Sequence, residues 1–155
     1  MDLKLSEQFF VRDNEEKDFG VLIDLTYRCA LECPRCQRQE FFRDHGEKVW
    51  GEDIPLDTIE KATDTFKAIN FGGQLSDPIH HPHFIEILKL CYNKGVHANI
   101  ATASTGKPKS WFIKAFEANP NARWQFGIDG LPEESHKYRV NQDGQKLFDI
   151  MCEAK

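Results

Sequence analysis

The chain has 155 residues, of which 40% are hydrophobic and 29% charged, and this balance predicts one folded domain with its own core. Its formal net charge of −5 at neutral pH predicts no broad basic face for nucleic acid or anionic lipid. There is no apolar run long enough to cross a membrane and no secretory signal pattern at the N-terminus, so we expect a cytoplasmic protein without membrane contact.

Short strand-like runs alternate with longer helix-like segments along the chain, and this order predicts βα units around a parallel sheet. The expected strands cover residues 20–26, 67–73, 96–103 and 123–129. The expected helices cover residues 55–66, 82–94, 109–117 and 142–153, and residues 37–55 are expected to be a long polar connection. Residues 1–19 are then an N-terminal extension, and residues 20–155 form one α/β domain of about four βα units.

Three of the five cysteines lie within eight residues, directly after the first expected strand. Cys29, Cys33 and Cys36 have the spacing C-x3-C-x2-C, and in a cytosolic chain such crowding indicates metal before disulfides. Thiolates are the usual ligands of iron–sulfur clusters, and a [4Fe–4S] cube held by three cysteines has one iron open to a small molecule. The alternative is a zinc site that adds a fourth ligand such as His45.

The remaining two cysteines, Cys91 and Cys152, stand apart on expected helices, and we expect them to be small buried hydrophobic residues rather than ligands. Basic residues follow or interleave the cysteine motif, and they predict either a solvated loop or a local positive field for an anionic ligand. These basic residues are Arg28, Arg35, Arg38, Arg43 and Lys48.

Two later segments complete a pattern at the ends of successive strands. Phe71-Gly72-Gly73-Gln74 ends the second expected strand, and the glycines allow the backbone to approach a ligand closely. The fourth expected strand ends in Ile128-Asp129-Gly130, followed by His136 and Arg139. Because chemistry in α/β folds gathers at the carboxyl ends of the strands, we expect these segments to meet the cysteine loop.

The cysteine spacing, the Gly-Gly turn and the Asp-Gly segment with its His and Arg resemble the radical S-adenosylmethionine (SAM) superfamily, over about residues 20–150. The resemblance implies a partial βα barrel with a [4Fe–4S] cluster on the three cysteines. It implies that SAM binds the open iron and is cleaved reductively, and that the resulting 5′-deoxyadenosyl radical abstracts hydrogen from the substrate. The chain would then be an oxidoreductase or activase; a zinc-stabilised binding module without catalysis is the alternative. The SAM contacts that the resemblance implies are Gly72, Gly73, Gln74, Thr102, Ser104 and Asp129.

The sequence departs from the family's pattern in three places. Arg35 stands where many members have an aromatic residue, Gln74 stands where the turn usually has glutamate, and Gly127 replaces a common serine. The segment His80-His81-Pro82-His83 is similar to the family's entry into the second helix, and we interpret it as a helix start rather than as a separate metal site.

The resemblance also implies partners. An electron donor such as a flavodoxin or ferredoxin would reduce the cluster, and the substrate would be a small molecule or a peptide that the sequence does not identify. Family members commonly have about six βα units and this chain supplies four, so we expect a fragment of a longer protein; the alternatives are a natural minimal version and a half-barrel completed by a second chain. Its fourth strand would carry a bare row of backbone donors and acceptors, which predicts self-association through an open sheet edge.

Overall fold

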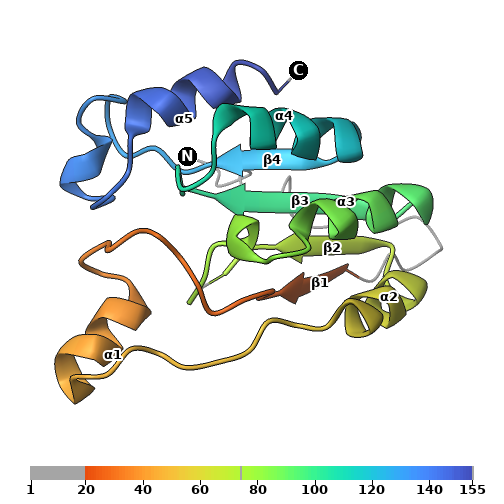
Figure 1. Cartoon of the computed structure of the whole chain (residues 1–155), viewed down its shortest axis with the longest axis horizontal. Coiled ribbons are helices and arrows are strands. Elements are labelled where there is room, and N and C mark those ends of the chain that lie inside the picture. Colours follow the sequence, from red (N-terminus) through yellow and green to blue (C-terminus); the bar gives the residue numbers. More distant parts are fainter. Residues whose placement is uncertain (1–19, 74, 155) are drawn as a thin grey trace, which may run out of the picture.

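The computed structural model describes residues 20–73 and 75–154, which form an α/β fold around a four-stranded parallel sheet (Figure 1). The strands are β1 (Gly20–Ile23), β2 (Ala68–Phe71), β3 (His97–Thr102) and β4 (Arg123–Phe126). The helices are α1 (Gln37–His45), α2 (Leu56–Thr65), α3 (Phe84–Asn93), α4 (Lys109–Ala118) and α5 (Gly144–Met151). Two short 3-10 helices are η1 (Pro78–His80) and η2 (Ser135–Lys137).

The sheet order β1-β2-β3-β4 follows the chain, and each neighbouring pair is parallel. Each crossover therefore moves the chain by one strand, and the prediction of four βα units is confirmed. Because all four strands point the same way, the loops that follow them gather at one end of the sheet.

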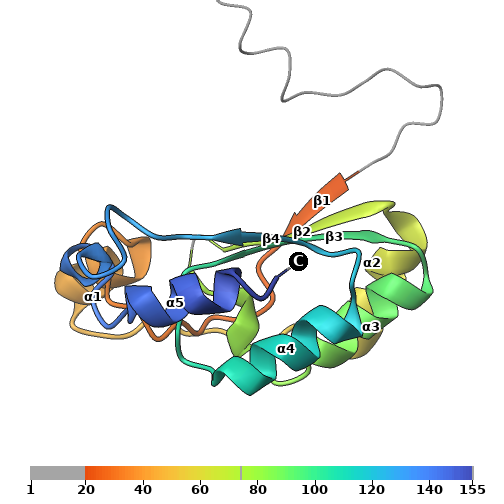
Figure 2. The same cartoon turned by 90° about the horizontal axis from the view of Figure 1, so that it is seen from above.

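The hydrophobic core lies between the sheet and one layer of helices, α2 to α5, on one face of the sheet (Figure 2). Alternate residues of β2 and β3 point into it, among them Phe71 and Ile100, while α3 contributes Phe84 and Leu88. Fully burying such a side chain stabilises the fold by about 1.5–3 kcal/mol. Residues on the other sheet face are more accessible, and Leu22 is 63% exposed there.

Helix α1 was not expected from the sequence, where residues 37–55 were interpreted as a polar connection. It has no buried residue, so it lacks the apolar stripe that identifies a core-facing helix. The carbonyl of Cys36 accepts from the amides of Gln39 and Glu40 at its start, and Gly46 ends it with a φ of 71°. The helix is thus formed by local backbone bonds and a left-handed glycine cap rather than by burial.

The two isolated cysteines differ from each other. Cys91 is fully buried on α3, as predicted. The prediction for Cys152 is wrong: its side chain is exposed, just beyond the end of α5. The inward-facing residues of α5 are Leu147 and Ile150, and Cys152 follows them where the helix has already ended.

Candidate active site at the carboxyl ends of the strands

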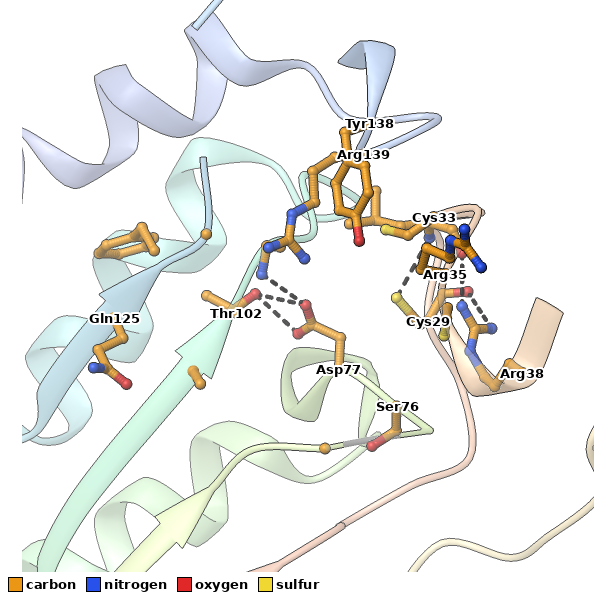
Figure 3. A pocket seen from close by; sticks show the side chains of 17 residues that line it. Cys29, Cys33, Arg35, Arg38, Ser76, Asp77, Thr102, Gln125, Tyr138 and Arg139 are labelled. Atoms are coloured by element: carbon orange, nitrogen blue, oxygen red, sulfur yellow. Dashed lines mark hydrogen bonds between the residues drawn. The ribbon is translucent and has the colours of Figure 1, made fainter. Parts of the chain in front are cut away.

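A pocket of about 590 Å³ opens where the loops after all four strands meet, and this volume suits a small-molecule ligand (Figure 3). The loop after β1 contributes Cys29, Cys33 and Cys36, and the loop after β2 contributes Gly73 and Asp77. The remaining walls come from the ends of β3 and β4 and the segment that follows β4: Ala101, Thr102, Ala103, Gln125, Phe126, Gly127, Tyr138 and Arg139. The expected meeting of these segments is confirmed.

The cysteine loop presents three partly exposed cysteine side chains to this pocket. The amide of Leu31 donates to Cys29 Sγ at 3.4 Å, and the amide of Cys36 donates to the Cys33 carbonyl at 3.0 Å. Burial raises the pKa of the Cys29 thiol to about 11, and the nearby Asp77 carboxylate adds to the rise. Without a metal ion to replace its proton, Cys29 is therefore a thiol at neutral pH.

The described residues contain no group of three or more His, Cys, Asp or Glu side chains arranged to hold a single metal ion. His45 lies at the far end of α1, where its Nδ1 is 3.0 Å from the Phe41 carbonyl. His45 is nine residues after Cys36, which corresponds to roughly 13 Å along the helix axis. This position does not suit the fourth ligand of a zinc site.

The Gly-Gly turn after β2 has one position where glycine is required. A Cβ atom on Gly73 would overlap Asp24 Oδ1 and lie 2.5 Å from Ser76 Oγ, whereas one on Gly72 would only touch Ala101 at 3.6 Å. Gly73 lines the pocket and Gly72 does not. The predicted contact Gln74 lies outside the described residues.

Asp77 is the acidic residue of the pocket, and the sequence interpretation did not identify it as part of the site. Its side chain is only 4% exposed. It accepts hydrogen bonds from the Thr102 hydroxyl at 2.9 Å (Figure 3) and from the amides of Ala103 and Ser104, both at 3.0 Å. Burial raises the pKa of this carboxyl. The signal in the sequence was an acidic residue three positions after the end of the turn segment and directly before Pro78, a pattern that is equally typical of a helix cap.

The two hydroxyl residues predicted on β3 have different positions. Thr102 lines the pocket, and its hydroxyl is bonded to Asp77. Ser104 lies beyond the end of the strand, is fully buried, and has its Oγ 2.8 Å from His80 Nε2. Ser104 therefore does not reach the pocket, because its hydroxyl fixes η1 instead.

The three histidines at 80, 81 and 83 do not form a common site. His80 faces Ser104, and the Nε2 atom of His81 lies 3.0 Å from the Ile54 carbonyl. His83 pairs with Glu86 on the surface of α3. Each histidine has its own partner, which is consistent with the interpretation of this segment as a helix start.

Asp129 reaches the pocket through another residue. Its carboxylate is ion-paired with Arg139, whose guanidinium lines the pocket and also contacts Cys33. Gly127 lies beneath this guanidinium, and a Cβ atom there would be 3.3 Å from Arg139 Nη2. Gly127 thus leaves the space that Arg139 occupies, which gives a physical reason for a missing side chain at this position.

The segment after β4 is tied to the strand ends by Gln142, another residue that sequence reasoning missed. Its side-chain amide donates to the carbonyls of Ala103 at 2.6 Å and Gly127 at 2.8 Å, and its Oε1 accepts from Ser135 Oγ at 2.5 Å. The amide of Glu32 in turn donates to the Val140 carbonyl at 3.1 Å. The segment that carries Arg139 is therefore bonded both to the sheet and to the cysteine loop.

No protein-family model matches this chain. A stretch of 84 residues, 54% of the chain, is 30% identical to the tungsten-containing aldehyde ferredoxin oxidoreductase cofactor-modifying protein of Pyrococcus furiosus. The match covers 23% of that relative, so the chain spans about a quarter of its length. Among the helices of the described residues, none is long and apolar enough to span a bilayer.

Proposed function

We propose that this chain is the core of a radical SAM enzyme, in which Cys29, Cys33 and Cys36 hold a [4Fe–4S] cluster and the pocket beside them takes SAM and a substrate. One observation carries the proposal: the three thiols line the same pocket as Gly73, Asp77 and Arg139, at the carboxyl ends of the strands. When bound, such a cluster supplies the electron for reductive cleavage of SAM to the 5′-deoxyadenosyl radical.

The donor set fits a cluster better than a single ion. Three sulfur ligands on one short loop suit iron–sulfur chemistry, and each cysteine of a cubane binds a different iron, so the thiols need not converge on one point. A tetrahedral zinc site requires four converging ligands, and the described residues contain no such group.

The chain's own residues supply the contacts that SAM needs. Asp77 is a buried carboxylate at the pocket wall, and no lysine or arginine pairs with it among the described residues. An uncompensated buried charge is costly, so a ligand ammonium beside Asp77 would stabilise the complex. Gly73, from the same loop, also lines the pocket, and the Arg139 guanidinium can donate a hydrogen bond to a carboxylate or hydroxyl of the ligand.

The similarity to a cofactor-modifying protein supports an enzyme that acts on a small molecule rather than on a peptide. An electron donor such as a flavodoxin or ferredoxin completes the proposed reaction.

The test is anaerobic reconstitution with iron and sulfide, followed by iron analysis and an assay for 5′-deoxyadenosine under reduction. We expect a brown protein with about four irons per chain. Changing Cys29, Cys33 or Cys36 to alanine should remove the cluster, while Cys152→Ala, at an exposed cysteine far from the pocket, is the matched control and should keep it. A colourless protein with stoichiometric zinc would instead support the binding module.

A further inference from the structure

Arg38 is placed to act on the cysteine loop from the first turn of α1. Its Nη1 donates to the Cys29 carbonyl at 3.3 Å, and its Nη2 donates to the Leu31 carbonyl at 2.6 Å (Figure 3). One planar guanidinium therefore joins the helix that begins after the last cysteine to the backbone around the first. A lysine could not make both bonds with this fixed geometry.

The third nitrogen of the same side chain has no protein partner. Arg38 Nε is buried, and it has no hydrogen-bond acceptor among the described residues. Buried polar groups are normally paired, so an orphaned donor needs an explanation. Arg38 lines the 590 Å³ pocket and a second cavity of about 550 Å³ on the other side of the cysteine loop, so the missing acceptor can belong to a bound group.

Among the described residues, the positive charge of Arg38 has no carboxylate partner, unlike that of two other arginines near the site. Arg28 is paired with Asp53 at 2.7 Å and Arg139 with Asp129, whereas Arg38 donates to the neutral carbonyls of Cys29 and Leu31. Its guanidinium is hydrogen-bonded to the backbone of Cys29, so its charge lies close to that residue. A full positive charge thus lies beside a ligand of the proposed centre.

We propose that Arg38 is a positioning residue that fixes the cysteine loop and offers its Nε–H and its charge to the iron–sulfur centre held there. This inference rests on the proposed function. Reduction by one electron from a low-potential donor makes such a centre more negative, and hydrogen bonds and positive charge nearby favour the more negative state. Arg38 therefore makes the centre easier to reduce.

The experiment compares Arg38→Gln and Arg38→Lys with the wild type, and Arg43→Gln is the matched control because Arg43 is exposed on the same helix. In the protein without metal, hydrogen exchange is followed at two amides of the cysteine loop. The amide of Cys36 is bonded to the Cys33 carbonyl within the loop, and the amide of Glu32 is bonded to the Val140 carbonyl outside it. We expect exchange roughly tenfold faster in Arg38→Gln, because two bonds to the loop are lost, and no change in Arg43→Gln. Equal exchange in all variants would overturn the positioning role.

In the reconstituted protein, the midpoint potential is measured by electron paramagnetic resonance during titration with dithionite and mediators. We expect a more negative potential in Arg38→Gln, a smaller shift in Arg38→Lys, which keeps the charge, and none in Arg43→Gln. If Arg38→Gln fails to load, Arg38→Lys carries the comparison. A loaded variant with unchanged potential overturns the electrostatic role alone. A wild type that binds no cluster overturns the proposed function and the electrostatic role together, while the exchange data still decide the positioning role.

Discussion

Gln142 offers the most direct test of how the site is built. Its side chain is 5% exposed and makes three hydrogen bonds, to Ala103, Gly127 and Ser135. Gln142→Leu keeps most of the volume but leaves two half-buried carbonyls and one buried hydroxyl without this partner. At about 1 kcal/mol for each buried bond lost, the free energy of unfolding should fall by about 3 kcal/mol. For a chain of this size that corresponds to a decrease in Tm of about 6–12 °C.

The assay is urea denaturation followed by circular dichroism, with thermal unfolding as a second measurement. The matched control is Gln145→Leu, because Gln145 is exposed on α5 and bonds only Asp149 four residues away. The control should change the unfolding free energy by less than about 0.5 kcal/mol. If Gln142→Leu is as stable as Gln145→Leu, the segment after β4 is not held to the strand ends as described.

Three further predictions concern the pocket. Burial raises the pKa of the Asp77 carboxyl, so the folded state keeps a proton that the unfolded state loses. The free energy of unfolding of the wild type, relative to that of Asp77→Asn, should therefore fall as pH rises above about 4. A difference that does not depend on pH would refute this. Gly73→Ala should lower the unfolding free energy by about 1–3 kcal/mol, because the new methyl group meets a carboxylate, while Gly72→Ala should be nearly neutral; equal effects in urea denaturation would contradict the close approach. In the metal-free protein at pH 8, iodoacetamide should label exposed Cys152 well before Cys29, and labelling of Cys29 should accelerate as pH approaches its pKa of about 11; mass spectrometry showing equal rates would refute the burial of Cys29.

The sequence was informative wherever a periodic apolar pattern met a buried environment. The strands and the core-facing helices were predicted in the correct order because each has residues such as Ile69, Phe84 or Leu147 that face one side. Helix α1 was missed because it has no buried residue. Cys152 was wrongly predicted to be buried because the average burial of cysteine takes no account of where the helix ends.

For the candidate site, the sequence identified several residues that line the pocket but not the residues that hold them in place. The cysteine spacing and the Gly-Gly turn are local motifs, so each could be found from a single strand and the loop that follows it. The roles of Asp77 and Gln142 depend on partners far away in the sequence, and no local pattern encodes such bonds. Ser104 shows the converse, because a polar residue in a suitable place is bonded to His80 instead of facing the pocket.

The bond between the Glu32 amide and the Val140 carbonyl has a consequence for the order of folding. Most contacts in this fold join neighbouring βα units, so the sheet can grow strand by strand with short loop closures. The bond from Glu32 to Val140 instead joins the first unit to the segment after β4. The chain between these two residues is long, so closing this loop has a larger entropic cost than pairing neighbouring strands. The loop that carries the cysteines therefore acquires its final shape only after the fourth unit has docked. During synthesis, the cysteine side chains are therefore exposed before the rest of this pocket has formed.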